Sequence, residues 1–153
     1  MVRLADVPMP ERTFLENMPI PEIEDAPCVA GPPLKERRVA IVTTAGLTAR
    51  EDPRFAMGSS DYRVIPADVD ASRLVMSHAS INYDRSGFQR DVNVVFPIDR
   101  LRELADDGVI GSVADFHYSF MGAIDAVTLE PAAAQLAGLL KKDAVDAVLL
   151  TPV

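Results

Sequence analysis

The stretch RVAIVTTAGL, from Arg38 to Leu47, decides the fold class of this 153-residue chain. Its first half is an almost unbroken apolar run rich in β-branched residues, which is typical of a strand buried on both faces of a parallel sheet. Its second half turns polar at Thr43 and Thr44 and then reaches Gly46, which predicts a turn. We therefore expect a central buried strand that carries hydroxyl groups to one edge of a sheet.

Strand-like and helix-like patterns alternate after this stretch. The segments that we predict as strands or extended chain are DYRVIPADV from Asp61, LVMSH at 74–78, VNVVFP at 92–97, the run 113–121 and a buried strand at 147–150. We predict a polar loop over 79–90. One helix is expected after a cap at Asp99 and before Gly108, and a second over 130–142. This alternation predicts a layered α/β domain with a mostly parallel sheet, of Rossmann or flavodoxin type.

The N-terminal region has a different composition. Seven of the 12 prolines lie within the first 33 residues, and proline both removes backbone donors and blocks helix interiors. We therefore divide the chain into an extended proline-rich arm over residues 1–36 and an α/β domain over 37–153. The arm also carries apolar residues, among them Phe14, with which it is expected to pack on the domain or on a partner chain.

Charge and composition exclude several classes of protein. The formal net charge is -8 and no basic patch is evident, so nucleic acid is not an expected partner. No apolar run approaches the roughly 20 residues of a membrane span, and the first residues lack the pattern of a secretory signal. The single cysteine, Cys28, cannot form an internal disulfide or a cysteine metal cluster. These features predict a cytoplasmic protein.

Ligands of parallel sheets bind beyond the carboxyl ends of the strands. That rule selects residues at the ends of the predicted strands: Thr43, Thr44, Gly46, Ser77, His78, Pro97 and Thr151. The candidate substrate-binding residues are Thr43, Thr44, Gly46 and Thr151 from this set, with Asn93 from the polar segment before the first clear helix. A plain strand-to-loop turn explains 43–46 equally well.

The two histidines, His78 and His117, are the candidate catalytic residues, because imidazole carries protons near neutral pH. Each is also explained by ordinary hydrogen bonding to polar neighbours. Their spacing to Asp84 or Asp91 matches no pattern of metal ligands, so we expect no metal.

Several longer strings of the sequence together resemble one known family. The string SHASINYDRSGFQRDVNVVFPIDRLRELADDGVIGSVADFHYSFMG at 77–122, with RRVAIVTTAG, SDYRVIP and DAVDAVLLTPV in the same order, resembles the selenoprotein B subunits of glycine, sarcosine, betaine and D-proline reductases. The resemblance covers about residues 37 to 153. In that family a strand ending like Thr151–Pro152–Val153 is followed by selenocysteine, or sometimes cysteine, in a Sec-x-x-Cys pattern.

The resemblance implies thiol-dependent reductive cleavage of a C–N bond. A selenolate would attack the α-carbon of a small amino-acid-like substrate, and the nearby cysteine would resolve the product as a selenenyl-sulfide. His78 or His117 would donate a proton to the leaving amine, while Asn93 and the turn at 43–46 would line the site. A pyruvoyl group would lie on a partner subunit, and no cofactor is expected in this chain itself.

The resemblance also offers an explanation for the length of the chain. We expect the reading frame to stop at a UGA selenocysteine codon after Val153, which would leave an incomplete sheet and an inactive product. Two alternatives stay open. The chain is either a non-catalytic binding or regulatory module, or a different small-molecule enzyme that uses the same pocket. Oligomeric state is also left open, with a homo-oligomer among the partners considered. A truncated chain is expected to expose apolar surface beside its last strand and to self-associate, whereas a complete module is expected to be monodisperse.

Overall fold

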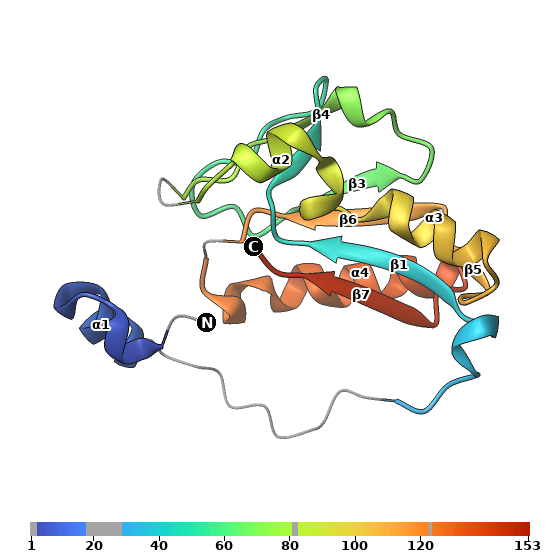
Figure 1. Cartoon of the computed structure of the whole chain (residues 1–153), viewed down its shortest axis with the longest axis horizontal. Helices are drawn as coiled ribbons and strands as arrows, with labels where there is room; N and C mark the ends of the chain where they lie inside the picture. The colour runs from blue at the N-terminus through green and yellow to red at the C-terminus, as the bar shows by residue number, and fades with distance from the viewer. Residues whose placement is uncertain (1–2, 18–28, 81–82, 123) are drawn as a thin grey trace.

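The computed structural model describes residues 3–17, 29–80, 83–122 and 124–153 (Figure 1). Its centre is a curled, mostly parallel sheet with helices on both faces, which confirms the predicted mixed α/β class. The finer assignment to a Rossmann or flavodoxin topology stays a prediction. Cys28 lies outside the described residues.

Strand β1 (Arg38–Thr43) is the centre of the sheet, as its apolar sequence predicts. It pairs in parallel with β7 (Ala147–Thr151) on one side. On its other side it pairs in parallel first with β5 (Ser112–Val113) and then with β6 (Phe116–Phe120). Strand β3 (Tyr62–Pro66) adds an antiparallel edge beside β6. Three neighbouring parallel strands therefore end at the same edge.

Strand β7 is more exposed than predicted. It pairs with β1 alone among the described strands, and its middle residues Val148, Leu149 and Leu150 are all exposed, Leu150 at 68%. The apolar sequence of this strand correctly predicts its location next to β1. The prediction that the strand is buried is wrong for the chain as described, because no described element covers its outer face.

A second, two-stranded sheet lies beside the first. Strand β2 (Leu47–Ala49) pairs antiparallel with β4 (Leu74–Met76). The LVMSH segment thus forms a strand as predicted, but it belongs to this β2–β4 ribbon and not to the parallel sheet. The turn at Gly46 has a φ of 64°, so the chain leaves β1 and enters β2 through a left-handed residue.

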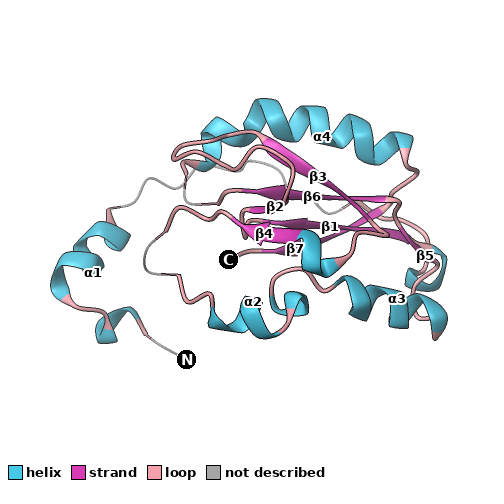
Figure 2. Ribbon diagram, turned by 90° about the horizontal axis from the view of Figure 1, so that it is seen from above, coloured by secondary structure: helices cyan, strands magenta, loops and turns pink. Residues whose placement is uncertain are grey.

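Helix α4 (Glu130–Lys142) covers one face of the sheet, while α3 (Ile98–Asp106) and the short α2 (Ser86–Arg90) lie on the other (Figure 2). The bounds of α4 agree with the sequence prediction. The α3 helix ends at Asp106, and Gly108, whose φ is 70°, follows two residues later as the predicted glycine terminator. The predicted cap at Asp99 is wrong, because Asp99 lies within the first turn of the helix. One core, which includes Ile41 and Phe96, lies apart from the smaller core that Tyr118, Phe120 and Leu136 form against α4.

Two predictions before α3 are wrong. The VNVVFP segment is not a strand, because Val92–Val94 forms a 3-10 helix. The Asp91 carboxylate accepts the Asn93 N–H at 2.9 Å, and this local bond favours a helical turn over an extended chain. The predicted loop over 79–90 also contains α2.

The described part of the N-terminal region is more helical than predicted. Met9–Glu16 forms helix α1, which starts at a proline-containing first turn and buries none of its residues. Further 3-10 turns lie at Leu4–Asp6 and Leu34–Glu36, and elsewhere at Ala71–Arg73 and Ala126–Leu129. The prediction of a mostly extended arm is therefore wrong over α1, where prolines occupy helix-compatible positions. Phe14 is 67% exposed and makes no core contact.

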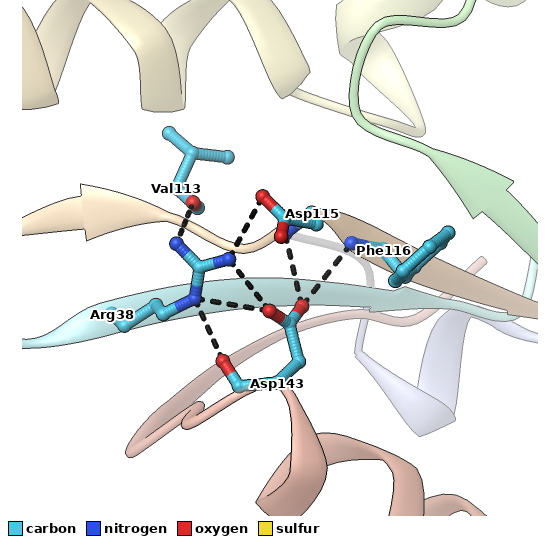
Figure 3. A network of polar contacts seen from close by, with 5 residues as sticks. All are labelled: Arg38, Val113, Asp115, Phe116 and Asp143. Carbon is cyan, nitrogen blue, oxygen red and sulfur yellow. Dashed lines mark hydrogen bonds and ion pairs between the residues drawn. The ribbon is translucent and has the colours of Figure 1, made fainter.

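A polar network joins the strands at the amino end of β1 (Figure 3). The Arg38 guanidinium donates to the Asp143 carboxylate at 2.6 Å and to the Val113 carbonyl at 2.8 Å. The second oxygen of Asp143 accepts the backbone N–H groups of Asp115 and Phe116 at 2.9 and 3.3 Å. Burial disfavours the charge of Asp143, but its bonds to Arg38 and to these N–H groups outweigh burial and lower its pKa.

Candidate functional site

The predicted threonines meet at the carboxyl ends of β1 and β7. Thr43 and Thr151 both direct their hydroxyl groups at the Val95 carbonyl, at 2.8 and 3.2 Å. The Thr43 side chain is fully buried. These two hydroxyls therefore anchor the segment between α2 and α3 on the sheet, and their hydrogen bonds are already used within the protein.

Thr44 lies at the same edge but is more accessible. Its N–H donates to the Thr151 carbonyl at 3.2 Å, and its hydroxyl oxygen accepts the Val153 N–H at 2.8 Å. The chain that leaves β7 is thereby held against the end of β1. Figure 1 shows the C-terminus beside this end of the strand.

Two glycines allow His78 to approach this edge. A Cβ added at Gly46 would lie 2.8 Å from the His78 backbone nitrogen. A Cβ added at Gly122, whose φ is 86°, would lie 2.7 Å from the Thr44 carbonyl oxygen and 3.0 Å from His78 Nε2. Both positions therefore require glycine on steric grounds. The imidazole of His78 borders Gly122, which in turn borders Thr44.

The His78 ring has one satisfied and one unsatisfied nitrogen. Nδ1 accepts the Ser80 N–H at 3.1 Å, so the neutral ring carries its hydrogen on Nε2. Nε2 is buried and has no hydrogen-bond partner among the described residues. Burial, and then the positive charge of Arg85, lower the pKa of His78. The side chain therefore presents a neutral N–H donor at pH 7, and an unpaired buried donor is costly unless a ligand uses it.

Neighbouring side chains fix the position of His78. Arg85 donates through Nη2 to the carbonyls of His78 and Ser80, at 2.7 and 3.0 Å. The Ser77 hydroxyl donates to the Gly46 carbonyl at 3.1 Å, which ties the residue before His78 to the end of β1. The ring of Tyr83 lies with its centroid 5.3 Å from that of His78.

His117 and Asn93 are held by different contacts. His117 is fully buried in β6, accepts the Ile41 N–H at Nδ1 (2.9 Å) and packs edge-on against Phe96. Its Nε2, like that of His78, is buried and has no hydrogen-bond partner among the described residues. Burial, followed by the charge of Arg102, lowers its pKa to about 4. Asn93 accepts the Asp99 N–H at 3.0 Å and so caps the start of α3. These contacts serve the fold, and they place neither side chain beside Thr44 or Gly122. The catalytic role of His117 and the binding role of Asn93 stay predictions.

Sequence reasoning missed Gly122, because its close contacts are with residues distant in sequence. It selected Ser77 together with His78 at a strand end. Arg85 lies in the predicted polar loop, but its contact with the His78 carbonyl has no local signal. Val95 was also missed, since its contribution is a backbone carbonyl. Among the described residues, no group of three histidine, cysteine or acidic side chains is arranged to hold a metal.

The fold and this site define a class: an α/β protein whose polar site lies at the carboxyl ends of its parallel strands. The family model for glycine/sarcosine/betaine reductase selenoprotein B (GRDB) matches residues 7–153. The chain belongs to this family.

Curated relatives agree with the family match. The D-proline reductase subunit gamma of Acetoanaerobium sticklandii is 39% identical over 77% of this chain and 49% of its own length. The glycine reductase complex component B subunit gamma of Symbiobacterium thermophilum is 32% identical over 90% of this chain and 34% of its own. The betaine reductase complex component B subunit beta of Peptoclostridium acidaminophilum is 32% identical over 90% of this chain and 33% of its own.

These relatives are much longer than the chain. It spans about a third to a half of their length. No solved structure matches the chain significantly. None of the helices in the described ranges has both the length and the apolar character that crossing a membrane requires.

Proposed function

We propose that this chain forms the N-terminal α/β part of a selenoprotein B-type reductase, which cleaves a C–N bond of a small amino-acid-like substrate with electrons from thiols. The family match and the names of the relatives support the reaction class. The same names describe subunits of larger complexes, so we also propose that the active enzyme includes partner subunits, one of which carries a pyruvoyl group.

One observation carries the proposal. The unpartnered Nε2–H of His78 borders Gly122, Gly122 borders Thr44, and Thr44 holds the N–H of Val153. A residue that follows Val153 would therefore emerge beside a buried hydrogen-bond donor at the carboxyl edge of the sheet. This is the expected place for a nucleophile in an α/β enzyme.

A selenocysteine at that position would supply the chemistry that the described residues lack. Its selenolate would form a bond to the substrate α-carbon while the C–N bond breaks and the electron pair leaves with nitrogen. A substrate nitrogen that starts as an ammonium group leaves as neutral ammonia or amine, so this step needs no external proton. A thiolate would then attack selenium, so that the Se–C bond breaks, its electron pair stays on the α-carbon, which takes up a proton, and a selenenyl-sulfide forms. A second thiol would reduce this selenenyl-sulfide, which returns the selenolate and leaves the two thiols as a disulfide.

The residues of this chain would position the chain that leaves β7 and stabilise the departing nitrogen. His78 donates a hydrogen bond from Nε2 to the lone pair of the departing nitrogen. The lowered pKa of His78 favours this neutral form at pH 7 over the imidazolium that a full proton transfer requires. Thr44 orients the chain that leaves β7, and the carbonyl contacts of Thr43 and Thr151 keep the three strand ends together.

Two experiments test the proposal. The nucleotides after codon 153 are expected to hold an in-frame UGA followed by a Sec-x-x-Cys frame, whereas UAA or UAG without such a frame would contradict the position of the nucleophile. The product translated through that codon, with its partner subunits and a dithiol, should cleave the C–N bond of at least one of glycine, sarcosine, betaine and D-proline. The first three would release ammonia or an amine, whereas D-proline would open its ring and keep the amine. The same product with serine at the selenocysteine position is the matched control and should cleave none of them.

A further inference from the structure

A groove of about 270 Å³ opens on the β2–β4 ribbon where α2 packs against it. Three arginines, Arg50, Arg54 and Arg85, line this groove. Apolar side chains from β4 and α2 line it as well: Leu74, Met76 and Phe88. The groove thus combines several guanidinium groups with an apolar surface in a chain whose formal net charge is -8.

Two of these arginines lack a partner within the part of the chain that the structure describes. The side chains of Arg50 and Arg54 are exposed and form neither an ion pair nor a hydrogen bond there. The neighbouring acid Glu51 forms its ion pair, at 3.1 Å, with Arg73. An acidic protein that leaves adjacent guanidinium groups unpaired around one groove has a local surface suited to an anion.

The third arginine joins the groove to the candidate site. Arg85 uses Nη2 for the carbonyls of His78 and Ser80. Its Nε and Nη1 hydrogens have no partner among the described residues, so these single donors stay available to a ligand. Met76, which lines the groove, precedes His78 by two residues. A ligand in the groove therefore lies next to the loop that positions the imidazole.

We propose that this groove binds the carboxylate of a small organic acid with a short aliphatic body. Guanidinium groups bind carboxylates through paired, charge-assisted hydrogen bonds, and the apolar side chains accommodate the aliphatic part. The inference deepens the proposed function, on which it rests for the identity of the acid: an amino-acid substrate or its deaminated product. Binding itself requires no selenocysteine and no partner subunit.

The test is a titration of the full chain with isovalerate, followed by two-dimensional amide NMR. Isovaleramide is the neutral control of the same shape. Isovalerate should shift the amide signals of residues 50, 54, 74–76 and 85–89, and isovaleramide should not. Arg54→Gln and Arg50→Gln should each weaken binding about fivefold, and the double variant about twentyfold, because each removes one charged donor.

Lys141→Gln is the matched variant, since it also removes one positive charge but lies on α4. It should change the isovalerate Kd less than about twofold. Equal binding of isovaleramide, or equal weakening by Lys141→Gln and Arg54→Gln, would overturn the assignment. His78→Asn should leave isovalerate binding unchanged, so a failure of the groove and a failure of the proposed reaction give different results.

Discussion

The polar groups at the two ends of β1 differ in how completely they are hydrogen-bonded. At the amino end, Arg38 and Asp143 satisfy each other and also bind the backbone of the neighbouring strands (Figure 3). At the carboxyl end, His78 is buried with Nε2 unpartnered among the described residues. A satisfied buried network stabilises a fold, whereas an unsatisfied buried donor destabilises it until water or a ligand pairs with it. The Nε2 of His78 meets this condition at the edge where ligands of parallel sheets bind. We therefore assign a structural role to the polar groups at the amino end of β1 and a role in the reaction to those at its carboxyl end.

The two histidines share a buried Nε2 that has no hydrogen-bond partner among the described residues, and they differ in what surrounds the ring. His117 uses Nδ1 to complete the hydrogen bonding of Ile41, at the point where the break between β5 and β6 interrupts the pairing with β1. His78 uses Nδ1 to fix its own loop and turns Nε2 towards Gly122. Both rings have lowered pKa values because they are buried, so the pKa alone does not distinguish them. The residues around each ring distinguish the two histidines.

The largest effect is expected at the amino end. Asp143→Ala should lower the free energy of unfolding by about 3–5 kcal/mol, because it removes the buried carboxylate that pairs with the partly buried Arg38 guanidinium and accepts two strand N–H groups. Urea unfolding at pH 7 measures this loss. Asp115→Ala removes the other carboxylate of Arg38, which is 74% exposed, and should cost less than about 1 kcal/mol. Equal costs would show that the network does not depend on the buried carboxylate.

The next effect concerns pH and His117. Its pKa is about 4 in the folded chain against 6.5 unperturbed, so the unfolded chain binds more protons between these values. The stability that His117 contributes is present above pH 6.5 and is lost as the pH falls towards 4, by about 3 kcal/mol in total.

His117→Asn is the variant that tests this dependence. The asparagine oxygen can still accept the Ile41 N–H, but the side chain does not titrate. Urea unfolding from pH 7 to 4 should show a shallower loss of stability for His117→Asn than for the unaltered chain. The same slope in both would contradict the lowered pKa.

A smaller effect is expected at the carboxyl end. Gly122→Ala introduces both a strained positive φ and close contacts with Thr44 and His78, and should cost about 2–3 kcal/mol. Gly58→Ala has a similar φ of 77° but no atom within 4 Å of the added Cβ, and should cost about 1 kcal/mol. Thermal unfolding of both variants separates backbone strain from the close approach. If the two cost the same, His78 does not pack on Gly122 as described.

Sequence reasoning was most successful where local patterns decide the structure. The α4 helix is marked by Pro131 and by leucines at helical spacing, and β1 by its apolar run. It failed at 92–97, where β-branched residues imitate a strand but side chain to backbone bonds of Asp91 and Asn93 form a turn.

The site was predictable only in part. The rule for strand ends found Thr44, Gly46 and His78, which the structure brings together. It missed Gly122 and Arg85, because their contribution depends on which distant residue they contact after folding. It named both histidines as candidate proton donors, since no local signal shows whether a ring serves the backbone or faces a site.

The most direct measurement compares kcat for two matched variants of the selenocysteine-containing enzyme with its partner subunits. His78→Asn keeps an acceptor for the Ser80 N–H but removes the Nε2 donor, and His117→Asn keeps an acceptor for the Ile41 N–H. We expect kcat to fall about 100-fold for His78→Asn, with partial recovery in His78→Gln, which restores a donor near Nε2. His117→Asn should stay within about twofold at pH 7. An unchanged kcat for His78→Asn, or an equal fall for His117→Asn, would contradict the assignment of chemistry to the carboxyl end.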